Sequence, residues 1–319
     1  SQNRGTMLMT VIRVFEGTPC AEAGMLPGDV ITAVDGENVT GMELDLVVNN
    51  YIKGEEDTEV TVTVYRETTD EYLDLTMKRA NIETPTVEHE MMENGIGYIL
   101  VTQFEGVTAQ QFKEAVDDLE SQGMEKLIID LRNNPGGLLD AAVEMAAYLL
   151  PDGTIVRTEY KNGKGDEYYS ENGQLKADST AGTRLNQYPV EDGHELDIPM
   201  AILVNGNSAS AAEVFAGAMR DFDRAVLVGT TTFGKGIVQS VIPFTDGDAI
   251  KITTAHYFTP SGFDLHGKGL EPDIPVELSE ELLQQAVVEL EDDNQVQAAV
   301  EYLSEETAGE EPDDPGMAA

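Results

Sequence analysis

The chain has 319 residues, 41% of them hydrophobic, which is enough to bury a full core and to form two domains. Its 60 acidic and 19 basic residues give a net charge of −41, and we exclude nucleic acids and anionic lipid surfaces as partners because such a charge repels both. Cys20 is the single cysteine, which excludes an intrachain disulfide and a metal site built on several thiolates.

The first part of the chain has the pattern of a small β-rich domain. The stretches "DVITAVDG" and "EVTVTVYRE" alternate apolar and polar residues, as strands with one buried face do. One helical stretch lies between them, with apolar side chains at Leu44, Val47, Val48 and Tyr51. We therefore predict a domain over residues 1–79. Residues 80–95 are polar, contain a proline and lack sustained periodicity, which predicts a linker.

From residue 96 onward, strand patterns alternate with helix patterns. The run "EKLIIDL" is continuously apolar, as in a buried parallel sheet, and "IPMAILV" and "AVLVG" read the same way. Between "EKLIIDL" and the apolar helix "LLDAAVEMAAYLL" lies the turn "NNPGG". This alternation predicts an α/β core over residues 96–278.

Other segments interrupt or follow this core. Residues 153–196 are polar and rich in Gly, Asn and Tyr, which predicts an inserted hairpin or lid. Asp246 to Asp248 read as the turn of a second hairpin. We predict a helical segment over residues 279–303 and a disordered acidic tail over residues 304–319.

The stretch "NGNSASAAE" contains a candidate nucleophile at the boundary between a strand and a helix. Ser210 and Glu213 match a capping box, which is a purely structural role. A serine at this position also presents its hydroxyl at a helix start, where the amide of Ala211 and the helix dipole favour a developing oxyanion. The local pattern leaves both interpretations open.

A nucleophilic serine needs a base, and none of the four histidines lies in a catalytic motif. They are His89, His194, His256 and His266, of which His256 in "TTAHYF" is the best candidate. Lys235 in "FGKGIVQ" is the alternative, because two flanking glycines allow a tight turn that buries the amine and favours its neutral form. Gln239 follows four residues later and could orient that amine.

Taken together, these motifs resemble the carboxyl-terminal processing proteases, also called tail-specific proteases. "NSASAAE", "FGKGIVQ", "TTAHYFTPSG" and "GKGLEPDI" are similar to the catalytic region of that family, and "LIIDLRNNPGG" resembles another of its signatures. "VFEGTPCAEAGMLPGDVITAVDGENV" is similar to its PDZ domain. The resemblance extends from about Met7 to Val276.

The resemblance implies a PDZ-like domain followed by an α/β protease core of the ClpP and crotonase type. It implies Ser210 as nucleophile, Lys235 as general base and then general acid, and Gln239 as the residue that positions Lys235. The oxyanion hole would use the backbone amide of Ala211 and that of Gly136 or Gly137. The implied reaction is endoproteolysis near a C-terminus through an acyl-enzyme, with neither a metal nor an organic cofactor.

The resemblance also implies partners and a compartment. The partners would be proteins or peptides with exposed apolar C-termini, with a homo-oligomer as a further possibility, and the protein would be exported to the periplasm, cell envelope or medium. Two positions depart from the family pattern, since His256 and Phe263 stand where basic residues are frequent. The short segment before Met7 is compatible with a PDZ domain truncated at its start.

Two other functions remain as alternatives. A catalytically silent PDZ scaffold would bind chain ends without cutting them, but the presence of Ser210, Lys235 and Gln239 argues against it. A crotonase-type acyl-CoA enzyme is suggested by fold kinship alone.

Overall fold

The computed structural model describes residue 2 and residues 6–15, 17–82, 85–182, 194–244, 248–282 and 288–308. It divides into two compact units, Ser1–Pro85 and Thr86–Ala319, each of which is described by itself. In these ranges, the structure contains no helix with the length and apolar character needed to cross a bilayer.

The first unit is a five-stranded antiparallel sheet with short helices. Its order is β1 (Met9–Thr10), β2 (Val30–Val34), β4 (Glu59–Arg66) and β5 (Glu71–Lys78), and β3 (Glu37–Asn38) pairs with β2. Its helices are α1 (Pro19–Glu22), α2 (Leu44–Val47) and the π-helical turn Val48–Ile52, and the last two form the predicted helical stretch. On β4, Val60, Val62 and Val64 are buried and the residues between them are not, so the alternation that predicted this strand is the alternation of its two faces.

The second unit is built on a six-stranded sheet. Its order is β16 (Ile274–Pro275), β13 (Val226–Gly229), β12 (Met200–Val204), β8 (Lys126–Asp130), β7 (Ile96–Val101) and β6 (Val87–Met91). All neighbouring pairs are parallel except β6 with β7. The predicted α/β core is therefore a mostly parallel sheet.

Residues 80–95 were predicted to be a linker, but strand β6 occupies Val87–Met91 of this segment, so the prediction is wrong for these residues. The strand pairs with β7 from Val87 to Met91. Glu88 and Glu90 are not buried, because an edge strand has a neighbour on one side only. The polar composition of an edge strand is what made it look like a linker.

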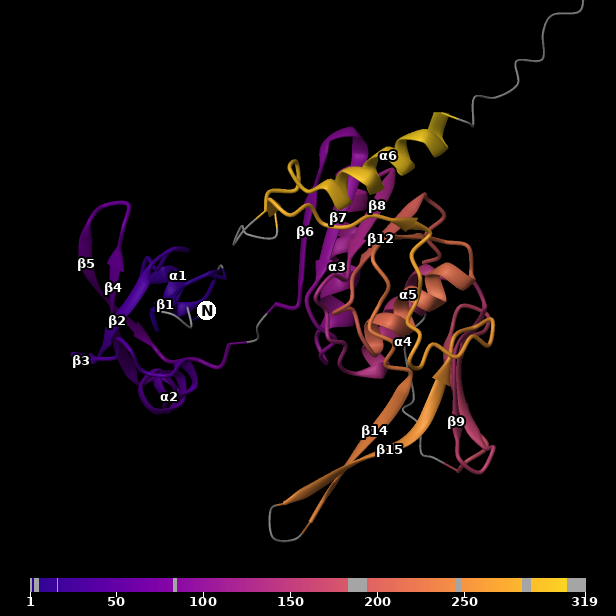
Figure 1. Ribbon diagram of the computed structural model, residues 1–319, viewed down its shortest axis with the longest axis horizontal. Helices are drawn as coiled ribbons and strands as arrows, with labels where there is room; N and C mark the ends of the chain where they lie inside the picture. Colours follow the sequence, from indigo (N-terminus) through magenta and orange to yellow (C-terminus); the bar gives the residue numbers. More distant parts are fainter. Residues whose placement is uncertain are drawn as a thin grey trace, which may run out of the picture. The chain divides into compact units, whose positions relative to one another are not determined.

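Helices cover both faces of this sheet (Figure 1). On one face α3 (Thr108–Ser121), α4 (Leu139–Leu149) and α5 (Ala211–Asp221) pack against alternate strand residues such as Ile202 and Val204. On the other face α6 (Asn294–Ala308) packs against the residues between them, such as Ala201 and Leu203. Burial on both faces explains why these strands are continuously apolar.

A second sheet of the same unit contains the inserted segment. Its antiparallel order is β11 (Leu175–Ser179), β10 (Gly165–Ser170), β9 (Gly153–Tyr160), β15 (Ala249–Phe258) and β14 (Ile237–Pro243). The predicted insertion thus supplies three strands to a sheet, and β14 with β15 forms a hairpin that projects from the core (Figure 1). Residues 183–193 of the insertion and 245–247 of the hairpin turn lie outside the described residues.

The end of the chain differs from the predicted boundaries. Helix α6 (Asn294–Ala308) continues beyond the predicted end at Leu303, and residues 283–287 of the predicted helical segment lie outside the described residues. The remaining tail, residues 309–319, lies outside the described residues.

Candidate active site

Ser210 stands in a sharp turn between β12 and α5. Its backbone has φ 59° and ψ −116°, a combination that non-glycine residues adopt only when the surrounding structure enforces it. A strained strand-to-helix turn of this kind exposes the nucleophilic serine in other hydrolases. Ser208 has a different role, because its buried hydroxyl donates to the carbonyl oxygen of Leu131 (2.7 Å) and accepts from the amide of Asn205 (2.9 Å).

The carboxylate of Glu213 connects the Ser210 turn to the Lys235 turn. Glu213 is fully buried, and its Oε2 accepts the backbone N–H of Ser210 (2.9 Å) and that of Lys235 (2.8 Å). Its Oε1 accepts the N–H of Gly234 (2.7 Å) and the hydroxyl of Thr232 (2.6 Å). The capping-box pattern at Ser210 and Glu213 is therefore present, and the same carboxylate also fixes the lysine turn.

A tyrosine makes a second connection between these turns. The buried hydroxyl of Tyr257 on β15 lies between the backbone carbonyl oxygens of Ser210 (3.0 Å) and Lys235. Burial, together with the charge of Glu213, raises the pKa of Tyr257 well above its usual value, so this group remains a hydrogen-bond donor. Neither Tyr257 nor the linking role of Glu213 was predictable from the sequence, because Tyr257, Thr232 and Gly234 are distant in the sequence from the residues that they contact.

The turn "NNPGG" packs directly against Ser210. A Cβ atom on Gly136 would lie 2.7 Å from the Cβ of Ser210 and 2.9 Å from the amide nitrogen of Ala211, so only glycine fits there. The amide of Gly136 donates to Oδ1 of Asn134 (2.9 Å). The sequence left open whether Gly136 or Gly137 supplies the second amide of the oxyanion hole. Because the amide of Gly136 is bound to Asn134, Gly137 is the better candidate.

One pocket brings the predicted residues together. It has a volume of about 290 Å³, and its lining includes Ser210, Ala211, Gly137, Lys235 and Gln239. Among the described contacts, no hydrogen bond joins the Lys235 amine to Ser210 or to Gln239. Hydrogen bonds of this kind are often long in unliganded enzymes and shorten when substrate binds.

The histidines lie elsewhere. His89 forms a hydrogen bond with Asp118 (2.9 Å), and His194 forms one with Glu120 (2.8 Å); the two acidic residues lie on the surface of α3. The rings of His256 and His266 contact one another edge to face. No histidine is found among the described residues that line the Ser210 pocket. Lys235 is the candidate base that shares this pocket with Ser210.

Two other features of the second unit lie apart from this pocket. A cavity of about 700 Å³ is lined by residues such as Met200 and Val226, at the opposite ends of the parallel strands, and no serine is among the described residues that line it. Asp117, Glu120 and His194 place their ligand atoms within 4.8 Å of one another. Because His194 already binds Glu120 and Tyr148 donates to Asp117 (2.7 Å), hydrogen bonds within the protein account for this cluster.

Family models and relatives match both units. The model of peptidase family S41 matches residues 95–276, and the model of the PDZ domain matches residues 10–66. A Staphylococcus aureus protein named "probable CtpA-like serine protease" is 38% identical over 277 residues, which cover 86% of this chain and 51% of the relative. A Staphylococcus haemolyticus protein of the same name is 39% identical over 263 residues, 82% of this chain and 49% of the relative. The chain thus spans about half the length of these curated relatives.

Solved structures agree with these matches. The photosystem II D1 C-terminal processing protease has a TM-score of 0.51 and 27% identity, with 92% of this chain and 72% of that chain covered. A Bacteroides fragilis structure, provisionally named an S41 protease, has a TM-score of 0.59 and covers 93% of this chain and 79% of its own; at 18% identity it supports the fold alone. The predicted architecture, a PDZ domain followed by an α/β protease core, is confirmed, and the S41 model covers more than half of the sequence: the chain belongs to peptidase family S41.

Proposed function

We propose that this protein is a serine endopeptidase that cuts protein substrates near their C-termini through a Ser-Lys-Gln mechanism. The observation that carries the proposal is that Ser210, Lys235 and Gln239 line one pocket together with Ala211 and Gly137. Among the described hydrogen bonds, none is donated by the backbone amide of Ala211 or by that of Gly137, so both amides are available to a ligand.

The reaction would proceed through an acyl-enzyme. The neutral amine of Lys235 takes the proton of the Ser210 hydroxyl as Oγ attacks the scissile carbonyl carbon. The amides of Ala211 and Gly137 donate to the resulting oxyanion, and the start of helix α5 adds its dipole. Lys235 then gives its proton to the leaving amine as the C–N bond breaks. A water molecule, deprotonated by the same lysine, attacks the ester, and Lys235 returns this proton to Oγ of Ser210 as the acyl group leaves. Gln239 would hold the amine in position.

We further propose that the PDZ domain selects the substrates. A PDZ domain binds a chain end by adding it as a strand to a sheet edge, which would direct cleavage to proteins with exposed apolar C-termini. The proposal includes an exported protein, because such an enzyme would meet these chain ends in the cell envelope.

The test is cleavage of an unstructured protein with an apolar C-terminus, followed by intact mass. We expect Ser210→Ala and Lys235→Ala to lower kcat by at least about 10³-fold, because nucleophile and base act as a unit. His256→Ala, outside the pocket, is the control and should retain activity. If the wild type binds the apolar C-terminus of the test protein but does not cut it, the result favours the catalytically silent scaffold. If Lys235→Ala keeps full activity, the proposed role of the lysine is wrong.

A further inference from the structure

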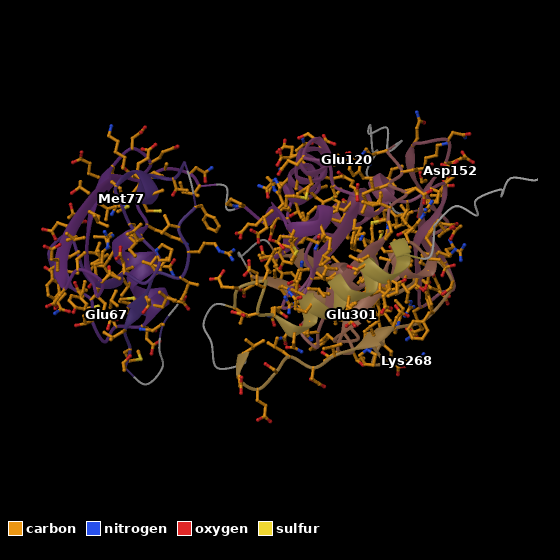
Figure 2. The ribbon with its side chains drawn as sticks, turned by 90° about the horizontal axis from the view of Figure 1, so that it is seen from above. Glu67, Met77, Glu120, Asp152, Lys268 and Glu301 are labelled. Carbon is orange, nitrogen blue, oxygen red and sulfur yellow. The ribbon has the colours of Figure 1, made fainter. Side chains whose placement is uncertain are left out.

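The catalytic pocket differs in charge from the rest of the molecule. The chain has 60 acidic and 19 basic residues, and Glu120, Asp152 and Glu301 are examples of exposed carboxylates on three parts of the second unit (Figure 2). The lining of the pocket nevertheless contains two lysines, Lys235 and Lys251, and no Asp or Glu among the described residues. The buried carboxylate of Glu213 behind the pocket is already occupied by the donors described above.

Lys251 reaches the pocket from the β14–β15 hairpin. The strand register pairs Lys251 with position 241, which is two residues after Gln239 on β14, so the two positions lie on the same face of the hairpin as Gln239. Lys251 is exposed, and none of the ion pairs between described residues includes its amine. It is therefore a cation with no partner from the described protein, beside the candidate catalytic residues.

The role of Lys251 must differ from that of Lys235. A general base acts in its neutral form, so the lysine that deprotonates Ser210 cannot also supply the positive charge that binds an anion. The remaining lining is largely apolar, with Leu138, Val214 and Val238 among its members, and fits an apolar side chain next to the scissile bond. Among the described residues of this lining, Lys251 is the charged side chain that remains to contact a substrate.

We infer that Lys251 is a specificity residue that binds a carboxylate of the substrate peptide beside the cleavage site. The inference rests on the proposed protease function. The carboxylate belongs either to the C-terminus of a short leaving peptide or to an Asp or Glu side chain near the scissile bond. Because the protein surface as a whole repels anions, a local cation is needed to hold such a peptide in the pocket.

The test compares two pairs of otherwise identical apolar peptides. The two peptides of the first pair differ only at the C-terminus, which is a free acid in one and an amide in the other. The two peptides of the second pair both have an amidated C-terminus and differ at one residue near the cleavage site, which is Glu in one and Gln in the other. The kcat/KM of each peptide is measured with the wild type, Lys251→Gln and Lys251→Arg. Lys176→Gln is the matched control, because it removes the same charge from β11, at the opposite edge of the same sheet.

We expect the wild type to prefer the carboxylate member of at least one pair by about fivefold, the scale of an exposed ion pair. Lys251→Gln should remove this preference, and Lys251→Arg and Lys176→Gln should keep it. A preference in the first pair identifies the C-terminal carboxylate, and one in the second pair identifies an acidic side chain. A wild type that cuts all peptides equally, or a Lys251→Gln variant that slows all of them equally, would overturn the inference while leaving the protease function intact. If the wild type cuts no peptide, protein substrate included, it is the proposed function that fails.

Discussion

Glu213 holds the backbone of Ser210 and that of Lys235 through one carboxylate oxygen, at 2.9 and 2.8 Å. The nucleophile turn is strained, with φ 59° at Ser210, and such a conformation persists only where contacts enforce it. A carboxylate is suited to this position, because an ionised carboxyl group only accepts hydrogen bonds and all of its partners here are donors. In the proposed mechanism Glu213 would therefore be a positioning residue, which acts by fixing the backbone of Ser210 and Lys235.

This role predicts a large effect of Glu213→Gln on activity. The amide NH₂ of glutamine would face two N–H or O–H donors, so the turns must separate to relieve the conflict. We expect kcat to fall by about 10²-fold with a smaller change in KM, because displacement of reacting groups by about 1 Å has that cost. Steady-state kinetics measure the split, and circular dichroism checks that the variant is folded.

The control for this variant is Glu114→Gln, which makes the same change on the exposed surface of α3. It should leave both kinetic constants unaltered. If Glu213→Gln is folded and has wild-type kcat, the carboxylate does not position the catalytic turns.

The residues of the site were predictable where their signal is local in the sequence. Ser210, Lys235 and Gln239 stand in short motifs with fixed spacing, and the structure places all three at one pocket. The link from Glu213 to Thr232 and Gly234 was not predictable, because a capping box explains the glutamate fully without it. Lys251 carried no motif, and its place depends on the register of the hairpin.

At the scale of elements, a buried ion network joins helix α6 to the start of the "NNPGG" turn. Arg132 donates to Asp130 (2.6 Å), the last residue of β8, and to Asp293 (2.7 Å), which directly precedes α6. Tyr98 also donates to Asp130 (2.8 Å). Burial opposes the charge of Arg132, but the two carboxylates outweigh burial and raise its pKa above the usual value. Helix α6 lies beyond residue 276, where the S41 match ends, yet it is tied to the segment that leads into the candidate oxyanion hole.

We predict that Arg132→Met destabilises the second unit by about 3 kcal/mol, because it leaves two buried carboxylates without their cation. Urea denaturation, monitored by a probe in this unit, measures the change. Arg157→Met is the control, since the pair of Arg157 with Glu167 is exposed and such pairs contribute about 0–1 kcal/mol. Equal losses in the two variants would show that the Arg132 network is not a specific support of the fold.

The boundaries of elements were less predictable than their existence. The apolar strands of the parallel sheet were recognisable because both of their faces are buried, whereas β6 at the edge was not. The start of α6 is set by Asp293, whose Oδ1 accepts the amides of Gln295 (2.9 Å) and Val296 (3.2 Å) while Oδ2 binds Arg132. This cap is fixed partly by a residue far away in the sequence, which a local pattern does not contain.

At the scale of the whole molecule, the net charge of −41 comes from 60 acidic and 19 basic residues. Like charges spread over a compact surface repel one another and favour the expanded, unfolded state. The PDZ domain and the protease core both contain this excess, since acidic residues are frequent along the entire sequence. The stability of the protein should therefore depend on ionic strength.

We predict that the midpoint of thermal unfolding, Tm, rises by about 3 °C when NaCl is increased from about 0.01 M to about 0.15 M at neutral pH. The Debye length falls over this range from about 30 Å to about 8 Å, which screens repulsion between distant surface charges but leaves buried pairs such as Arg132 with Asp130 nearly unaffected. Near the isoelectric point of about 4.1, where the net charge vanishes, the same increase in salt should leave Tm unchanged. Scanning calorimetry at neutral pH and near pH 4.1, each at the two salt concentrations, measures the effect. A Tm that stays constant or falls with salt at neutral pH would show that repulsion among carboxylates does not limit the stability of this protein.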